Sequence, residues 1–223
     1  MSRLLWLTLT SLLATASHTG AQTVSRAYAG VLFGVSVLSA DARSTTSNNA
    51  AGVSLYSPEN GSAANLFAGY HLSDYFTVQA NYMWNRNDVT LYSSFSADRS
   101  GGFYQQSRQS SQHAAVVDGL IYFRELRRAI RPYLGTGLSV FHFSSRPFGG
   151  DTSAVLTPPP TFASTKVALR SAVGVDIALS PRLSLRYTFS ETISRNPISP
   201  HLEPPGQRRL ANFQNLIGVL GTF

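Results

Sequence analysis

One histidine–serine pair has the spacing that nucleophilic catalysis could use. His142 and Ser144 stand two residues apart, so on a β-strand their side chains share one face, where an imidazole could take the proton of a nucleophilic hydroxyl. Such catalysis also needs a group that orients the imidazole, and Glu191 lies on a different predicted strand. We therefore interpret the pair as a polar contact near a strand end, and we do not expect an enzyme.

Four charged residues could neutralise one another inside the fold. Each falls opposite the aromatic and branched face of its predicted strand: Asp118, Arg170, Asp176 and Arg186. If residues 180–182 form a three-residue turn, Leu179 faces Leu183 and Asp176 lies directly across from Arg186, a favourable arrangement of opposite charges. We interpret the four as a paired, hydrogen-bonded interior cluster. The alternative is a gate whose pairs exchange partners to open a narrow path for ions.

Strands must carry these residues, because the chain contains eight segments of about nine to fifteen residues, several of which alternate strictly in polarity. The clearest are Arg182–Ile193 and Tyr75–Asn85. The remaining segments are Ala27–Leu38, Ala64–Leu72, Gln112–Phe123, Arg131–Phe143, Thr165–Leu179 and Arg209–Phe223. Alternation places two different environments on the two faces of each strand.

Long polar stretches and tight connections alternate between these segments. The long stretches are Ser39–Ser62, Asn87–Ser111, Ser144–Ser164 and Arg195–Arg208, and the tight connections lie at 73–74, 125–131 and 180–181. Up-and-down barrels of the outer membrane have short periplasmic turns and longer outside loops. The rhythm predicts an all-β fold, namely an eight-stranded antiparallel up-and-down transmembrane β-barrel.

Charges and aromatic residues indicate which face of each strand meets lipid. An arginine facing hydrocarbon at mid-depth costs about 2–4 kcal/mol, so the four charged residues should point into the barrel, which side chains can fill. Aromatic residues near segment ends predict interfacial girdles: Tyr75, Phe76, Tyr122 and Phe123 at the turns, and Tyr82, Trp84, Phe141, Phe143 and Phe189 toward the loops. A soluble barrel of lipocalin type, apolar inside, is the structural alternative.

The first residues have the composition of an export signal. Arg3 precedes the apolar run Leu4–Leu13, which is too short to span a bilayer as a helix. We predict a signal peptide at residues 1–21, cut after Ala16 or Ala21, and a barrel domain at 22–223. The chain has no cysteine and a net charge of +7, but export and the scatter of the arginines disfavour a nucleic-acid partner. No P-loop, dinucleotide or metal-ligand motif is present, so no cofactor or metal is expected.

Three turn-and-strand phrases and the last residue carry a resemblance to a known family. The phrases are GYHLSDYFTVQANY (69–82), RPYLGTGLSV (131–140) and ALSPRLSLRYTF (178–189). With the terminal phenylalanine, they resemble the small eight-stranded outer-membrane barrels of Gram-negative bacteria, of the OmpA membrane-domain and OmpX type. In that family a C-terminal aromatic residue, with apolar residues at alternate positions before it, is recognised by the barrel-assembly machinery, and Ile217, Val219 and Phe223 fit this pattern.

The resemblance implies a monomeric outer-membrane protein of structural or surface-interaction type, without a cofactor. Its partners would be the lipid bilayer and lipopolysaccharide, whose phosphates Arg108, Arg208 and Arg209 could contact near the outer rim. A narrow channel is one alternative function. A lipid A-modifying enzyme is another, because lipid A deacylase barrels use a His-x-Ser motif, but on the penultimate strand and with an acid about a dozen residues later. Residues 153–166 contain neither Asp nor Glu.

Overall fold

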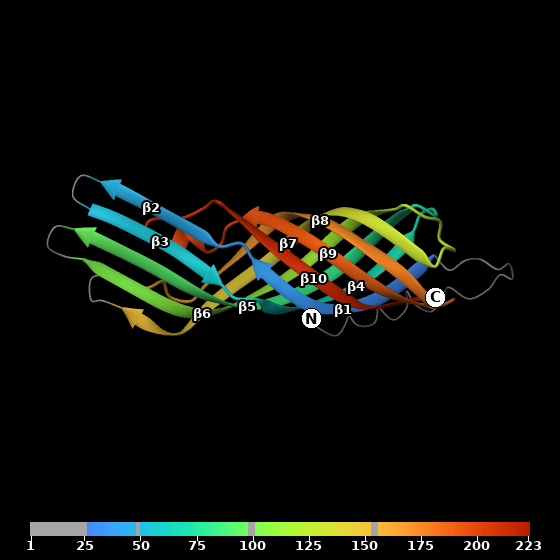
Figure 1. Cartoon of the computed structure of the whole chain (residues 1–223), viewed down its shortest axis with the longest axis horizontal. Helices are drawn as coiled ribbons and strands as arrows, with labels where there is room; N and C mark the ends of the chain where they lie inside the picture. Colours follow the sequence, from blue (N-terminus) through green and yellow to red (C-terminus); the bar gives the residue numbers. More distant parts are fainter. Residues whose placement is uncertain (1–25, 48–49, 98–100, 153–155) are drawn as a thin grey trace, which may run out of the picture.

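A computed structural model describes residues 26–47, 50–97, 101–152 and 156–223. The predicted signal peptide, residues 1–21, lies outside the described residues. Ten strands are β1 (Ala27–Leu38), β2 (Asp41–Ser47), β3 (Ala50–Pro58), β4 (Gly61–His71), β5 (Phe76–Ala97), β6 (Gly102–Tyr122), β7 (Ile130–Thr152), β8 (Phe162–Ser180), β9 (Leu183–Arg195) and β10 (Arg209–Thr222), and a short 3₁₀ helix, η1, spans Ser199–His201. They form an elongated barrel (Figure 1).

Eight of the strands close into an antiparallel ring. Its order is β1, β4, β5, β6, β7, β8, β9 and β10, and it closes where β10 pairs with β1, with Val31 opposite Val219. Closure leaves no free sheet edge within the ring, which satisfies every strand's main-chain groups as hydrocarbon surroundings require. The predicted fold class is confirmed.

The two further strands arise because the first hairpin is interrupted at the rim of the ring. The chain leaves the strand geometry at 39–40 and again at 59–60. Beyond these breaks β2 pairs with β3, and β3 pairs with the continuation of β5, where Tyr56 lies opposite Leu91. The predicted segments Ala27–Leu38 and Ala64–Leu72 therefore correspond to β1 and β4, and β2 and β3 extend the same hairpin.

The long polar stretches are mostly strands, which corrects their interpretation as loops. We call β2, β3 and residues 89–97, 102–108 and 146–152 the distal sheet; it extends beyond the ring at the left of Figure 1. β5 has 22 residues, about twice the ~9–11 that a strand needs to cross a bilayer. Polarity reports solvent exposure and not the absence of pairing, and Ser, Thr and Tyr are compatible with strands.

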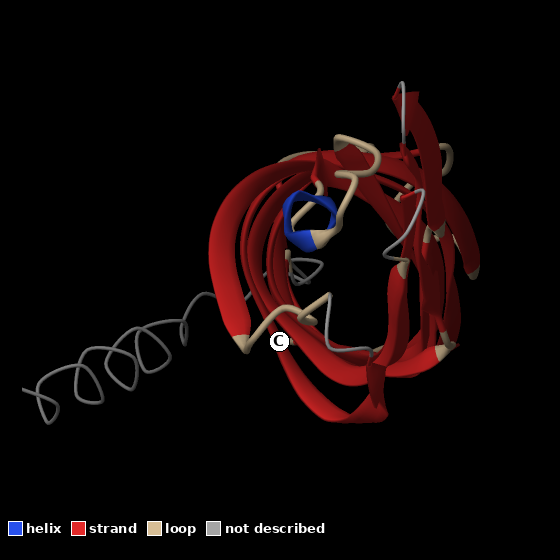
Figure 2. Ribbon diagram, turned by 90° about the vertical axis from the view of Figure 1, so that its left-hand side faces the viewer, coloured by secondary structure: helices blue, strands red, loops and turns tan. Residues whose placement is uncertain are grey.

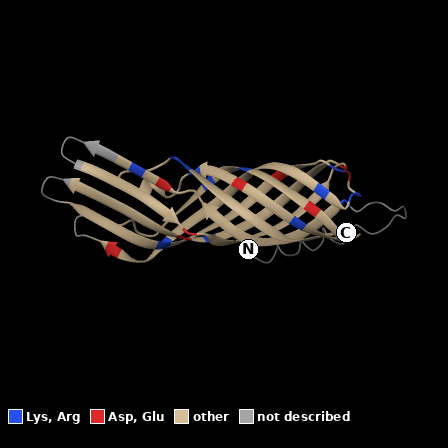
Figure 3. Cartoon of the chain, viewed as in Figure 1, with Lys and Arg blue, Asp and Glu red and all other residues tan. Residues whose placement is uncertain are grey.

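Side-chain polarity is reversed relative to a soluble barrel. Apolar side chains on the outer face of the ring are among the most exposed of the described residues: Phe33, Leu66, Val117, Leu138 and Val167, each at least 60% exposed. Charged positions are sparse along the strands (Figure 3), and those inside the ring are buried. An apolar outside around a polar inside favours the membrane barrel over the lipocalin type. No helix in the described ranges is long and apolar enough to cross a membrane.

The connections at the other end of the ring are short. In the turn after β4, the Ser73 hydroxyl accepts hydrogen bonds from the main-chain NH groups of Tyr75 and Phe76, at 3.3 and 3.1 Å. Between β8 and β9, Ser180 pairs with Leu183 and the register shifts between 178 and 180. The predicted pairing of Leu179 with Leu183 is therefore wrong, because the turn has two residues and Leu179 is the extra residue of an irregularity. We call this end, with its three short turns, the turn end.

Candidate functional site

Near the turn end, a bidentate ion pair lies inside the lumen. The Arg186 Nε and Nη2 atoms donate to Asp176 Oδ1 and Oδ2 at 2.6 and 2.7 Å. Asp176 and Arg186 are cross-strand neighbours, as the sequence predicts. Tyr122 donates its hydroxyl proton to Asp176 Oδ2 at 2.8 Å, and Arg186 also donates to Tyr122 and to Gln79. Every oxygen of the carboxylate is thus occupied, which is the condition for a buried ion pair to be favourable.

Aromatic rings surround the same guanidinium. The Arg186 Cζ atom lies 4.7 Å from the ring centroid of Phe67, 5.1 Å from that of Tyr133 and 5.3 Å from that of Tyr28. Cation–π attraction is strongest for such desolvated cations. We call Arg186, Asp176 and the aromatic residues around them the lower network. It occupies the lumen with packed side chains.

A second ion pair lies farther up the lumen, between Arg170 and Asp118. The two residues are on β8 and β6, and Gly137 of β7 stands between them in register with both. A Cβ atom at 137 would lie 2.1 Å from Asp118 Oδ1, so the glycine leaves the space through which the pair meets. Asn81 donates a further hydrogen bond to Asp118 Oδ2 at 3.0 Å. The sequence predicts that Asp118 and Arg170 both point into the barrel, but it does not predict that they pair. The feature that could have indicated the pair is Gly137, which is in register with both residues.

A small cavity lined by both polar and apolar side chains lies above the two ion pairs. Its volume is about 20 Å³, and its lining includes Asn85, Gln112, Ser139, Asn212 and Gln214. Buried polar atoms of Gln112, Ser139 and Gln214 have no hydrogen-bond partner among the described residues. A cavity of this size has room for about one water molecule, and these atoms would hold it. The cavity is too small to hold a solute much larger than water.

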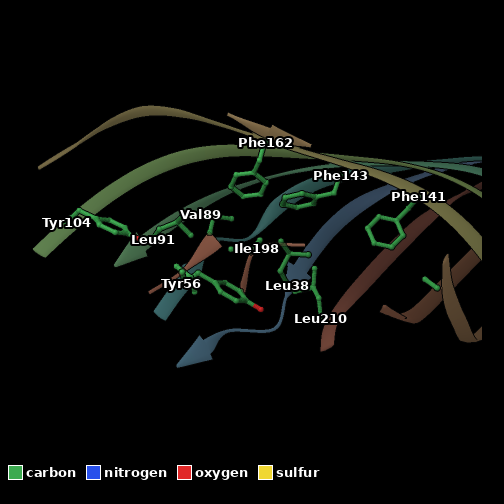
Figure 4. Close-up of a cluster of buried hydrophobic side chains, with 12 residues drawn as sticks. Leu38, Tyr56, Val89, Leu91, Tyr104, Phe141, Phe143, Phe162, Ile198 and Leu210 are labelled. Atoms are coloured by element: carbon green, nitrogen blue, oxygen red, sulfur yellow. The ribbon is translucent and has the colours of Figure 1, made fainter. Parts of the chain in front are cut away.

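A folded cap lies in the mouth of the barrel above this cavity. We define the cap as residues 196–208, which connect β9 to β10 and contain η1, together with residues 156–161 before β8. We call the end opposite the turn end the loop end. Viewed from the loop end, η1 lies inside the outline of the ring (Figure 2). Ile198 and Leu202 are buried in a cluster with inward-facing residues of the strands: Leu38, Tyr56, Val89, Leu91, Tyr104, Phe141, Phe143, Phe162, Ala168 and Leu210 (Figure 4). The predicted loop 195–208 is thus packed and not solvated.

The cap is fixed to the wall by a buried carboxylate. Asp41, at the start of β2, accepts hydrogen bonds from the Gln207 main-chain NH at 2.9 and 2.8 Å and from the Ser199 hydroxyl. A Cβ atom at Gly206 would lie 1.7 Å from Asp41 Oδ2, so only glycine permits this approach. Asn196 closes the turn before η1 by accepting from the NH groups of Ile198 and Ser199. Sequence periodicity carries no signal for these contacts.

Arg108, on β6, points into the barrel and binds the cap instead of facing lipid, which corrects its predicted contact with lipopolysaccharide. Its side chain is fully buried. All five of its NH protons are donated, to the Ser145 hydroxyl and carbonyl, to Gln106 Oε1 and to the carbonyls of Pro159 and Pro160. Arg108 is ten residues from Asp118 on the same strand, so its parity already indicated the inner face.

We expect Arg108→Lys to loosen residues 156–161. An ammonium group has three donors in place of five and cannot reproduce the fork geometry. Hydrogen bonds to charged groups contribute about 1.5–3 kcal/mol each, so cleavage of this proline-rich stretch by a protease that cuts after Leu156 should accelerate at least tenfold. Arg146→Lys is the matched control, since Arg146 is exposed and its side chain donates to Gln109 at the surface. Equal cleavage rates in the two variants would refute the role of Arg108.

We expect His201 to make the cap sensitive to pH. Its ring stacks on that of Phe162, with centroids 4.0 Å apart, and Arg108 lies over the same phenylalanine. Burial and then the charge of Arg108 lower the pKa of His201 below its ordinary value of 6.5. The folded cap therefore takes up a proton less readily than the detached loop, so cap stability is retained above pH 6.5 and falls below it.

Proteolysis of residues 196–208 should accordingly be faster at pH 5 than at pH 7.5. Cleavage is measured with a protease whose own activity is calibrated at both pH values on an unfolded peptide of the same sequence. His201→Gln should remove the difference, because the amide does not titrate. A pH dependence that persists in His201→Gln would assign it to another group.

The structure places the other predicted residues as follows. Phe141, Phe143 and Tyr122 face inward and are buried, so they do not belong to the aromatic girdles; Arg131, also buried, packs over the Tyr122 ring at 3.8 Å. Arg208 and Arg209 are exposed at the loop end, and the outward-facing C-terminal residues are Ile217, Val219 and Phe223. Their roles in lipid contact and assembly stay predictions.

His142 and Ser144 share the outer face but do not form a catalytic arrangement. His142 Nδ1 lies 3.1 Å from the Thr165 hydroxyl, and Ser144 Oγ lies 2.9 Å from Ser111 Oγ. Each side chain is therefore bonded to a neighbouring strand, and within the described part of the protein the imidazole of His142 contacts the Thr165 hydroxyl instead of an acid. Among the residues described, no group of three or more His, Asp or Glu side chains could hold a metal.

Comparisons with known proteins agree with this architecture. A model of the family described as outer membrane protein beta-barrel domain matches residues 6–206. Neisserial surface protein A superposes with a TM-score of 0.54 at 17% identity, covering 88% of this chain and 97% of that chain. Outer membrane protein OprG from Pseudomonas aeruginosa gives 0.55 at 12% identity, with coverages of 89% and 96%. A search of the curated proteins finds no match. At these identities the structural likeness shows the fold alone.

Proposed function

The chain belongs to the outer membrane protein beta-barrel domain family, and we propose that within this family it is a closed barrel of structural or surface-interaction type. The observation that carries the proposal is the double closure of the lumen. The cap buries Ile198 and Leu202 at the mouth, and the lower network fills the opposite end. A barrel of eight strands has room for little more than these side chains.

The two alternative functions have less support. A gated channel would need the ion pairs to exchange partners, yet Arg186 is held by Asp176, Tyr122 and Gln79 together with three aromatic rings. A lipid A-modifying enzyme would need an oriented base and nucleophile, whereas His142 and Ser144 are bonded to other strands. We therefore propose a protein that is not an enzyme and does not conduct.

The distal sheet is the part of the molecule that we propose meets partners outside the cell. The short turns, the start of β1 and the end of β10 all lie at the turn end of the barrel. In this class of barrel the short turns lie on the periplasmic side. The distal sheet then projects from the cell surface, on strands that are continuous with the rigid ring. Exposed segments on a rigid scaffold are the usual carriers of binding.

Shortening the distal sheet tests the interaction. Tyr92 and Gln105 are paired directly across β5 and β6, so an Asn-Gly turn can replace residues 93–104 without changing the register. The shortened barrel should retain the heat-dependent shift in gel mobility of a folded barrel but lose adherence of the displaying cells to protein- and glycan-coated surfaces. Unchanged adherence would refute a role for this hairpin.

Further expectations complete the proposal. We propose that residues 1–21 are removed on export, so N-terminal sequencing of the protein from outer membranes should begin after Ala16 or Ala21. We also propose that the barrel-assembly machinery recognises Ile217, Val219 and Phe223. Lipopolysaccharide is the proposed lipid partner of the monomeric barrel.

A further inference from the structure

Two arginines lie side by side on the outer face of the ring at the loop end. Arg195, at the end of β9, is the direct antiparallel partner of Arg209, at the start of β10. Both are exposed and share the outward parity of Ile193, so their guanidinium groups leave the same face of the sheet. Directly opposed residues have Cβ atoms only about 4.5–5.5 Å apart.

The pair lacks a compensating anion within the described part of the protein. Neither side chain takes part in an ion pair or hydrogen bond there. Glu191 shares the outward face of β9 but stands four residues before Arg195, which is roughly 13 Å along a strand. Like charges placed directly opposite each other destabilise a sheet, so the arrangement is favourable only with an external anion.

The height of the pair indicates what this anion is. Below Arg195 the outward side chains are Ile193, Glu191 and Phe189, and Phe189 stacks on Phe213 of the neighbouring strand with centroids 6.3 Å apart. The Phe189–Phe213 pair therefore marks the upper limit of the apolar belt on these strands, and Glu191 and the two arginines lie above it. In a bilayer this is the level of the outer-leaflet headgroups, and arginine binds phosphate with paired, charge-assisted hydrogen bonds.

We propose that Arg195 and Arg209 together bind one phosphate group of an outer-leaflet lipid. This inference rests on the proposed location in the outer membrane and adds a site to it. Arg195 was not among the residues that the sequence suggested for lipid contact. Arg208 precedes β10 and is not part of the pair. Its carbonyl accepts a hydrogen bond from the Asn196 NH at 2.9 Å, and this bond joins the two ends of the cap segment 196–208.

Lipid retention measured by native mass spectrometry tests the proposal. The purified barrel is exchanged into detergent with lipid A that carries its phosphates or with enzymatically dephosphorylated lipid A. The wild-type protein should retain the phosphorylated lipid at least tenfold better. Arg195→Gln with Arg209→Gln should abolish this preference, whereas Arg43→Gln, which removes an exposed arginine from the distal sheet, should leave it unchanged.

A competition arm separates the two sources of phosphate. Inorganic phosphate at 10 mM should leave lipid retention unchanged if the site takes a lipid, and displacement by it would overturn the lipid assignment. Equal retention of the two lipids by the wild-type protein, or a preference that survives the double substitution, would overturn the site. A folded double variant is verified by its heat-dependent gel mobility, and because the lumen is untouched, these outcomes are independent of whether the barrel conducts.

Discussion

Asp176→Ala is expected to lower the free energy of unfolding by about 3–5 kcal/mol, the cost of leaving one member of a buried ion pair without its partner. The substitution removes two hydrogen bonds from the Arg186 guanidinium and the acceptor of the Tyr122 hydroxyl. Arg186 keeps Gln79 and its aromatic neighbours but loses its ion-pair partner. Urea unfolding in phospholipid vesicles, followed by the fluorescence of Trp84, measures the change.

A surface pair on the same protein is the control for this substitution. Glu125 and Arg128 approach to 3.9 Å in a turn at the turn end and are both exposed, so Glu125→Ala should cost less than about 1 kcal/mol. Asp176→Leu combined with Arg186→Met should be less destabilising than Asp176→Ala alone, because no charge is left unpaired. A similar small effect of Asp176→Ala and Glu125→Ala would contradict the proposed importance of the lower network.

Phe143→Ala is expected to release the cap, with a cost of about 3–5 kcal/mol for the capped conformation. Phe143 is fully buried among the residues that receive Ile198 and Leu202, and its ring stacks on that of Phe162 at 6.1 Å. Truncation leaves a cavity where the cap packs. The cleavage rate of residues 196–208 by a protease should then rise at least a hundredfold, and the ring itself should keep its heat-dependent mobility.

Phe148 provides the matched control for the cap. It lies on the same strand as Phe143, five residues farther along, and is 64% exposed. Phe148→Ala should leave cleavage of the cap loop unchanged. Were Phe148→Ala to accelerate cleavage as strongly as Phe143→Ala, the acceleration would reflect general loosening of β7 and not loss of packing beneath the cap.

The ring could be predicted from the sequence because its determinants are local. Alternation within Tyr75–Asn85 and Arg182–Ile193 reports two environments through neighbouring residues alone. Short turns then fix which strands are antiparallel neighbours, and the register of Asp176 opposite Arg186 follows even though the turn was one residue shorter than expected. Such patterns depend on few long-range contacts.

The cap and the upper ion pair could not be predicted in this way. Ile198 is buried because residues from several strands surround it at the mouth, and no periodicity within 195–208 records that. The meeting of Asp118 with Arg170 depends on the empty space at Gly137 on a third strand. Polar stretches also conceal pairing, since a strand in solvent and a loop can have the same composition.

Conductance of the wild-type barrel in planar lipid bilayers tests the closed lumen most directly. The protein is delivered to the planar bilayer from lipid vesicles. Its folding is first verified by the heat-dependent gel mobility of protein recovered from those vesicles. A barrel closed by the cap and the lower network predicts no stepwise current at either polarity. Reproducible conductance steps from the wild-type protein, altered in Arg186→Ala or Asp118→Asn, would contradict the closed lumen and establish a channel.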